Sequence, residues 1–168
     1  MQPKEIIEII EGRFEGVVPK FSWGETSLFY NPENKLPNGV YFCTIKENDG
    51  DNDKSSNLDR SGIYRLSIGI GKDVYEQLFG ARPKRPDKGG IIDTGYDFAE
   101  NNVLMPHPIY GWMSWVQIIN PTESKFNEIL ELIEIAHKSA TIKFMKKITN
   151  KSNQPDAKKS APLFEVLG

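Results

Sequence analysis

Hydrophobic and polar positions along the chain follow two different periods. Residues 3–12 carry isoleucines at helical spacing with glutamates between them, which predicts a first helix that ends near Gly12. Residues 126–144 repeat the helical period. Thr122 precedes them and is a favourable N-cap, so we expect a long last helix over about 122–147.

Segments with the two-residue period of a strand, or with its residue preferences, lie between these helices. They cover residues 26–30, 40–45, 62–70 and 112–119. Turn residues over 31–39 separate the first two segments, which predicts an antiparallel hairpin. A short helix is expected over 72–79. The pattern predicts an α+β fold in which an antiparallel sheet packs against the N-terminal helix and the long C-terminal helix.

Three polar stretches interrupt or follow these elements. Residues 47–57 have almost no apolar side chains, which predicts a mobile acidic loop, and residues 81–90 form a basic loop rich in proline and glycine. The composition over 149–162 is typical of disorder. We therefore expect a single domain over residues 1–147, followed by a flexible tail rich in Lys, Ser and Pro over residues 148–168.

Charge and hydropathy limit the partners and the cellular location that the protein can have. The formal net charge of -2 excludes a globally basic nucleic-acid-binding protein. The charge is uneven, because six lysines against two carboxylates give residues 143–168 a charge of +4 and leave -6 for residues 1–142. No apolar run approaches the ~18 residues of a membrane span, and the first helix has the wrong pattern for a signal peptide. We expect a cytoplasmic protein that is not membrane-bound, and nucleic acid is disfavoured as its partner.

Motifs for metals and cofactors are incomplete. Cys43 is the only cysteine, so a cysteine-based zinc site is excluded. The acidic loop begins like a calcium-binding loop, but Lys54 and Arg60 stand where that loop requires glycine and glutamate. Residues 67–72 resemble a phosphate-binding loop but lack its first glycine and its final Ser or Thr. We therefore expect no metal and no cofactor.

The segment MPHPIYGWMSW over residues 105–115 is the strongest candidate for a functional site. Prolines on both sides hold His107 on a stiff segment, close in sequence to Tyr110 and Trp112. A histidine beside aromatic rings suits a small-molecule pocket, where it could act as a general acid or base. The alternative is a loop shaped by its prolines, with His107 bonded to a backbone carbonyl and the aromatic side chains in the core.

Charged residues complete the candidate site. Arg65 lies in the middle of a predicted strand, where it either faces solvent or points into a site. We expect Arg65 and Asp93 to lie near His107 and its aromatic neighbours. Cys43 is expected to be a buried, unreactive residue. The basic loop over 82–88 is either solvated or in contact with phosphate.

Two motifs carry a resemblance to known proteins. The sequence LDRSGIYRLSIG over 58–69 and MPHPIY over 105–110, followed by Trp115 and an Asn-Pro pair, resembles a family of uncharacterised bacterial proteins with LDRxGxxRLxIG and MPHPxY motifs. The resemblance extends from the first helix to about residue 145. The order of elements is also loosely similar to the MmcQ/YjbR-type fold. The resemblance implies a fold and no particular chemistry.

Three functional hypotheses follow from these observations. The first is a domain that binds a small ligand or a protein partner near the MPHPxY turn, through Arg65, Tyr110, Trp112 and Asp93. The second is an enzyme in which His107 is the acid or base and Arg65 holds an anionic substrate. The third is weak nucleic-acid binding through the basic loop and the tail.

Overall fold

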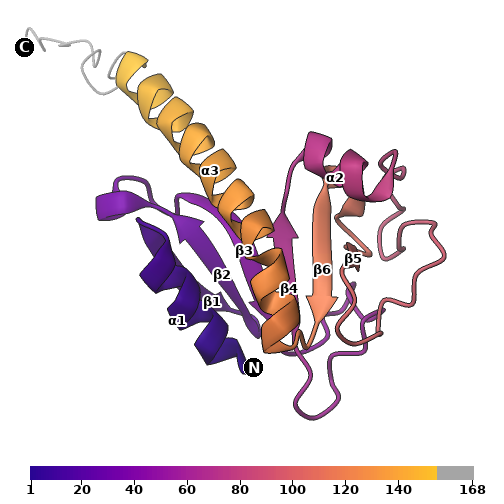
Figure 1. Cartoon of the computed structure of the whole chain (residues 1–168). Coiled ribbons are helices and arrows are strands. Elements are labelled where there is room, and N and C mark those ends of the chain that lie inside the picture. The colour runs from indigo at the N-terminus through magenta and orange to yellow at the C-terminus, as the bar shows by residue number, and fades with distance from the viewer. Residues whose placement is uncertain (155–168) are drawn as a thin grey trace, which may run out of the picture.

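The computed structural model describes residues 1–154 and has the α+β fold that the sequence predicts (Figure 1). The helices are α1 (Pro3–Arg13), α2 (Lys72–Phe79) and α3 (Glu123–Asn153), with short 3-10 turns η1 (Pro32–Asn34) and η2 (Gly111–Met113). The strands are β1 (Val17–Ser22), β2 (Glu25–Tyr30), β3 (Val40–Lys46), β4 (Arg65–Gly69), β5 (Met105–Pro106) and β6 (Trp115–Ile119). They form a six-stranded sheet in the order β1-β2-β3-β4-β6-β5, and every neighbouring pair is antiparallel.

The strand registers divide the sheet into an apolar face and a polar face. Cross-strand partners on the apolar face are Leu28, Cys43, Ile68 and Val116. Cross-strand partners on the polar face are Ser27, Thr44, Ser67 and Gln117. Helices α1 and α3 cover the apolar face (Figure 1), and their buried isoleucines share one core with its side chains. Because each buried aliphatic side chain contributes about 1.5–3 kcal/mol, this layer holds the fold together.

A β-bulge changes which face Tyr41 occupies. The register between β2 and β3 shifts so that Phe42 is an extra residue in β3. The Phe42 ring faces the helices and lies 5.4 Å from the ring of His137 on α3. Tyr41 instead lies on the polar face, where its ring stacks on Trp115 at 5.3 Å. Without the extra residue, Tyr41 would share the apolar face with Cys43, because side chains alternate along a strand.

Several strands differ from the sequence predictions. The strand expected over 62–70 covers only Arg65–Gly69. The strand expected over 112–119 begins only at Trp115, because residues 111–113 form a 3-10 turn and Ser114 adopts a left-handed conformation with φ of 67°. Trp112 is therefore not a strand residue. Strand β1 (Val17–Ser22) occupies a segment for which the sequence predicts no strand. It contains Pro19, which is tolerated because β1 lies at the edge of the sheet.

Helix α3 is longer than its sequence predicts. It begins after Thr122, whose side chain accepts a hydrogen bond from the Lys125 amide, and it continues to Asn153 instead of ending near residue 147. The first residues of the expected tail are thus helical, because extending an existing helix costs far less than starting one. The rest of that prediction, residues 155–168, lies outside the described part of the chain. Within residues 1–154, no helix combines the length and the apolar character needed to cross a membrane.

The acidic loop over 47–57 folds back on itself and on the polar face of the sheet. Asp49 accepts a hydrogen bond of 2.7 Å from the Leu58 amide, and Gly50 and Asp53 exchange backbone hydrogen bonds. Ser56 is fully buried. The loop is therefore anchored internally, although its composition predicts mobility.

Candidate functional site

A pocket of about 350 Å³, here called the polar-face pocket, opens on the polar face of the sheet. Strands β2, β3 and β4 contribute Glu25, Ser27, Tyr41, Thr44, Lys46, Arg65 and Ser67 to its lining. The lining is completed by Ser22, Trp23, Asp53, His107, Tyr110 and Trp115. Helices α1 and α3 take no part in it, because they cover the opposite face (Figure 1).

The fold brings some of the predicted site residues together and separates others. Arg65, His107 and Tyr110 all line the polar-face pocket. Asp93 is exposed to solvent and is not part of the lining. Trp112 also lies outside, in the 3-10 turn, with the guanidinium of Arg85 4.9 Å from its ring centre. The expected position of Trp112 rested on a strand that does not extend to it.

Asp53 is the partner of Arg65 inside the pocket. The Arg65 side chain is 2% exposed, and both of its terminal nitrogens donate to the Asp53 carboxylate, one of them at 2.8 Å. Burial alone would raise the pKa of Asp53, but the hydrogen bonds and charge of Arg65 outweigh it and hold the pKa below its usual value. The pair therefore stays ionised. The Arg65 charge is already compensated within the protein, which weakens its expected role as a holder of anions.

A second ion pair lies beside the first. Lys46 on β3 is the cross-strand neighbour of both Glu25 and Arg65, so the three side chains share one row of the polar face. The Lys46 ammonium lies 3.5 Å from the Glu25 carboxylate, and the lysine is 9% exposed. The charges of the lining are thus matched, two positive against two negative.

His107 is buried and its orientation is fixed by the backbone. Its Nδ1 accepts hydrogen bonds of 3.1 Å from the amides of both Ile109 and Tyr110. The imidazole therefore bonds to backbone amides and not to a carbonyl, which the alternative interpretation of this segment predicted. Because Nδ1 is an acceptor, the proton of the neutral ring lies on Nε2.

The surroundings of His107 favour its neutral form. Burial and the positive charges of Arg65 and Lys46 hold the pKa of His107 well below its usual value, against the opposing charge of Asp53. At neutral pH the ring is uncharged. Among residues 1–154, no group accepts a hydrogen bond from Nε2. Nε2–H is thus a fixed, unpaired donor on a residue that lines the pocket.

Two buried polar side-chain atoms of other lining residues have no hydrogen-bond partner within the described residues. They are Nε of Arg65 and the hydroxyl of Ser67. An unsatisfied buried polar group costs about 1–3 kcal/mol, and folded proteins keep few of them. Three other such atoms, the hydroxyls of Ser55, Thr94 and Ser114, lie on residues outside the lining, so the two in the pocket stand out by sharing one cavity.

An aromatic wall bounds the pocket next to these polar groups. The Trp115 ring lies across Gly69 on the neighbouring strand, where a Cβ atom would come within 2.9 Å of the indole. Only glycine at position 69 leaves room for this arrangement. Trp115 then stacks on Tyr41, which the bulge turns to the polar face.

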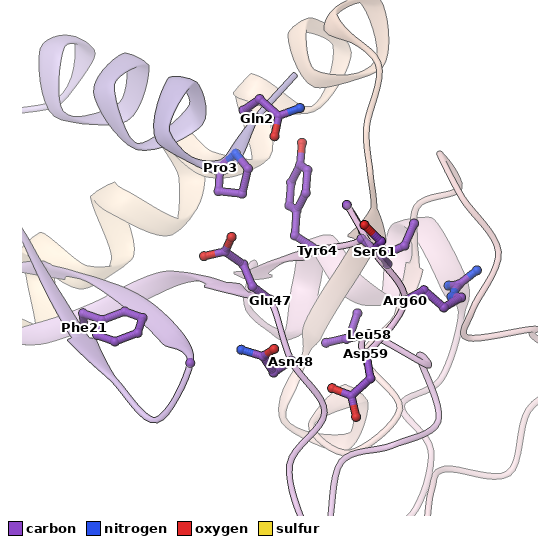
Figure 2. A pocket seen from close by; sticks show the side chains of 13 residues that line it. Gln2, Pro3, Phe21, Glu47, Asn48, Leu58, Asp59, Arg60, Ser61 and Tyr64 are labelled. Carbon is purple, nitrogen blue, oxygen red and sulfur yellow. The ribbon is translucent and has the colours of Figure 1, made fainter.

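A second cleft of about 410 Å³ lies near the start of α1 (Figure 2). Figure 2 shows Phe21 on one side of it and Tyr64 on the other, with the Arg60 head group directed away. The Tyr64 hydroxyl donates to the Met1 carbonyl at 3.0 Å, and Asp59 accepts from the Asp49 amide at 3.0 Å. None of the residues that line this cleft carries a buried side-chain polar atom without a partner in the described residues. The polar-face pocket is therefore the stronger candidate.

Sequence reasoning did not find several lining residues. Asp53 is one of several aspartates in the loop over 47–57, and the sequence does not distinguish it from the others. Its pairing with Arg65 depends on how the loop folds back. Ser67 and Thr44 alternate with apolar residues on predicted strands, so the two-residue period could have placed them on the face opposite the core. For metals, residues 1–154 contain no group of three or more His, Cys, Asp or Glu side chains arranged to hold an ion.

These features define an α+β protein with a charge-balanced pocket on the face of its sheet opposite α1 and α3. The chain belongs to the DUF6194 family of unknown function, whose family model matches residues 1–149. A comparison with curated proteins found no match, and neither did one with solved structures. The membership agrees with the expected resemblance to uncharacterised proteins. The similarity to the MmcQ/YjbR-type fold has no support from these comparisons and stays a prediction.

Proposed function

We propose that this domain binds a small polar molecule in the polar-face pocket. The observation that carries the proposal is a pair of buried, unpaired polar atoms on lining residues, the hydroxyl of Ser67 and Nε of Arg65. Beside them lies the Nε2–H of His107, which donates to no group within residues 1–154. A bound molecule that offers partners to such groups offsets the cost of burying them. The volume of about 350 Å³ lies within the ~300–1,000 Å³ that small-molecule pockets commonly have.

The state of His107 favours binding over acid–base catalysis. Nδ1 is occupied by two backbone amides, so the neutral ring has no free lone pair with which to accept a proton from a substrate. The lowered pKa also keeps the ring from carrying the extra proton that a general acid would donate. Arg65 is matched by Asp53, which reduces its attraction for an anionic substrate. These observations support a hydrogen-bond donor that recognises a ligand.

The remaining sequence hypotheses receive less support. Arg85 of the basic loop rests on Trp112, and residues 1–142 carry a charge of -6, which opposes binding to nucleic acid. We place the proposed function in the cytoplasm, as the sequence predicts. The support is the single cysteine, Cys43, which has no second cysteine in the chain with which to form a disulfide.

A ligand screen with two variants tests the proposal. The probes are soluble fragments that cover neutral rings, sugars, amino acids, carboxylates and phosphates, followed by thermal shift and ligand-observed NMR. We expect at least one fragment to raise the melting temperature of the natural chain, because a ligand that binds only the folded state stabilises it. In His107→Asn the amide oxygen can still accept the two backbone N–H groups, but the Nε2–H donor is lost, so the shift should shrink severalfold.

The matched control is Asp59→Asn, which changes a polar residue of the other cleft (Figure 2) and should leave the shift unchanged. Two results would contradict the proposal. One is a screen in which no fragment binds the natural chain. The other is a bound fragment whose affinity is the same in His107→Asn and Ser67→Ala but lower in Asp59→Asn.

A further inference from the structure

We infer that the ligand of the polar-face pocket contains a neutral, flat heterocycle of the nucleobase type, and that the exposed Trp23 stacks on this ring. The inference rests on the proposed function and adds the chemical class of the ligand. It depends on three observations: the conformation of Trp23, the balance of charge in the pocket, and the hydrogen-bonding groups that the lining leaves unpaired.

Trp23 occupies a position where neither backbone conformation nor packing favours a tryptophan. It is the first of the two residues that join β1 to β2, with φ of 56°, and Gly24 follows with φ of 73°. A two-residue turn with both φ angles positive favours Asn-Gly or Asp-Gly, since a large side chain is strained there. The residue is also 94% exposed, so burial does not stabilise it. Because it nevertheless lines the polar-face pocket, contact with a bound molecule would explain the ring.

Other aromatic rings surround the same pocket. Tyr110 comes from the MPHPxY turn and is 49% exposed, and its ring centre lies 5.0 Å from that of His107. Tyr41 and Trp115 form the stacked pair described above. Tryptophan and tyrosine rings with free surface are suited to contact with the flat face of another ring. Four aromatic side chains in one lining therefore favour a planar ligand.

The charges of the lining favour a ligand without charge. Lys46 is paired with Glu25, and Arg65 with Asp53, so an entering anion would find no uncompensated cation. It would also meet two carboxylates. Losing the hydration of a charge without gaining a partner is unfavourable, whereas a neutral molecule avoids this cost.

The unpaired groups of the lining favour hydrogen-bond acceptors on the ligand. Nε2–H of His107 and Nε of Arg65 can only donate, while the hydroxyl of Ser67 can donate or accept. Carbonyl oxygens and ring nitrogens on the edge of a heterocycle meet this requirement. A nucleobase or nucleoside is flat, uncharged and rich in such acceptors, and it matches a pocket of about 350 Å³.

Calorimetry and ligand-observed NMR on the full chain test this inference with defined probes. The neutral probes are uridine and inosine, the anionic probe is uridine 5′-monophosphate, the non-planar neutral probe is a methyl glucoside, and a short oligouridylate represents nucleic acid. We expect uridine or inosine to bind, and the phosphate and the sugar to bind at least tenfold more weakly. In Trp23→Asn we expect nucleoside affinity to fall about tenfold, within the range attributed to one base–aromatic stack.

The Trp23→Asn substitution should leave the fold intact, so a loss of affinity in this variant reports the lost ring. Asn-Gly is the preferred sequence for this turn, so the melting temperature should be equal to or higher than that of the natural chain. The matched control is Phe21→Thr, which removes an exposed aromatic ring of the same hairpin that lines the other cleft. Its nucleoside affinity should be unchanged.

The possible failures are distinguishable. Nucleoside binding that is equal in the natural chain and Trp23→Asn overturns the role of Trp23, and binding of the sugar or the anions in preference to nucleosides overturns the ligand class. Both results leave the proposed pocket function standing. Binding of oligouridylate without uridine overturns a free small ligand. If no probe and no fragment binds at all, the proposed function fails together with this inference.

Discussion

The Asp53 carboxylate accepts hydrogen bonds from both terminal nitrogens of Arg65, the first residue of β4. Asp53 comes from a loop that the sequence marks only as polar and acidic. The arginine is 2% exposed, so its charge depends on this partner. We expect Asp53→Ala to lower the free energy of unfolding by roughly 3 kcal/mol, because it leaves a buried charge unpaired. Chemical denaturation measures this loss.

Two comparisons show whether the loss comes from the unpaired charge. Asp51→Ala changes an exposed aspartate of the same loop and should alter stability by less than about 0.5 kcal/mol. Replacing both members of the pair, as in Asp53→Ala with Arg65→Met, should recover part of the loss, since no isolated charge then remains. A double variant as unstable as the sum of the two single variants would contradict this explanation.

The buried His107 gives stability a dependence on pH just below neutrality. Its pKa is lowered in the folded state, so the unfolded chain binds a proton first as the pH falls below about 6.5. The stabilisation is therefore complete above that value and decreases as the pH falls, by at most about 1.4 kcal/mol per pH unit. Denaturant titrations between pH 7.5 and 5 should show this slope, and His107→Asn should reduce it. An unchanged slope in the variant would argue against the buried neutral ring.

Asp53 affects stability in a lower pH range than His107. Because its pKa is lowered in the folded state, the stability that the Asp53 carboxylate contributes is lost only as the pH falls below about 4.

Gly69 makes room for the aromatic wall. In Gly69→Ala the new Cβ atom would lie 2.9 Å from the Trp115 indole, so the ring has to move. We expect a loss of about 1–3 kcal/mol in unfolding free energy and a changed near-ultraviolet circular dichroism signal. Gly12→Ala is the matched control: it lies on α1 with open space around it, and it should raise stability by about 0.5–1 kcal/mol. A harmless Gly69→Ala variant would show that the indole does not need this space.

Cys43 should be unreactive in the folded protein. The residue is fully buried, and burial raises the pKa of its thiol, so the reactive thiolate does not form near neutral pH. We expect thiol reagents such as iodoacetamide to modify Cys43 only after denaturation, as mass spectrometry would show. Rapid modification under native conditions would mean that the sheet opens locally around β3.

The sequence by itself determined the parts of this protein that depend on local periodicity. Helix α1, helix α2, the start of α3 and the β2–β3 hairpin follow from spacing, capping and turn residues within short segments. The burial of Cys43 follows from its place in an apolar strand. These features are predictable because each depends on neighbours three or four positions away in a helix, or two in a strand.

Only the tertiary structure decided which residues meet on the polar face of the sheet. The sequence singled out His107, Arg65 and Tyr110, but it also included Asp93 and Trp112, which lie outside the pocket. It did not indicate the pairing of Arg65 with its loop partner or the bulge that turns Tyr41 toward Trp115. The physical reason is that these contacts join segments far apart in the chain. They depend on strand order, on a shift of one residue in register and on a loop that folds back over the sheet, and none of these leaves a periodic trace in the sequence.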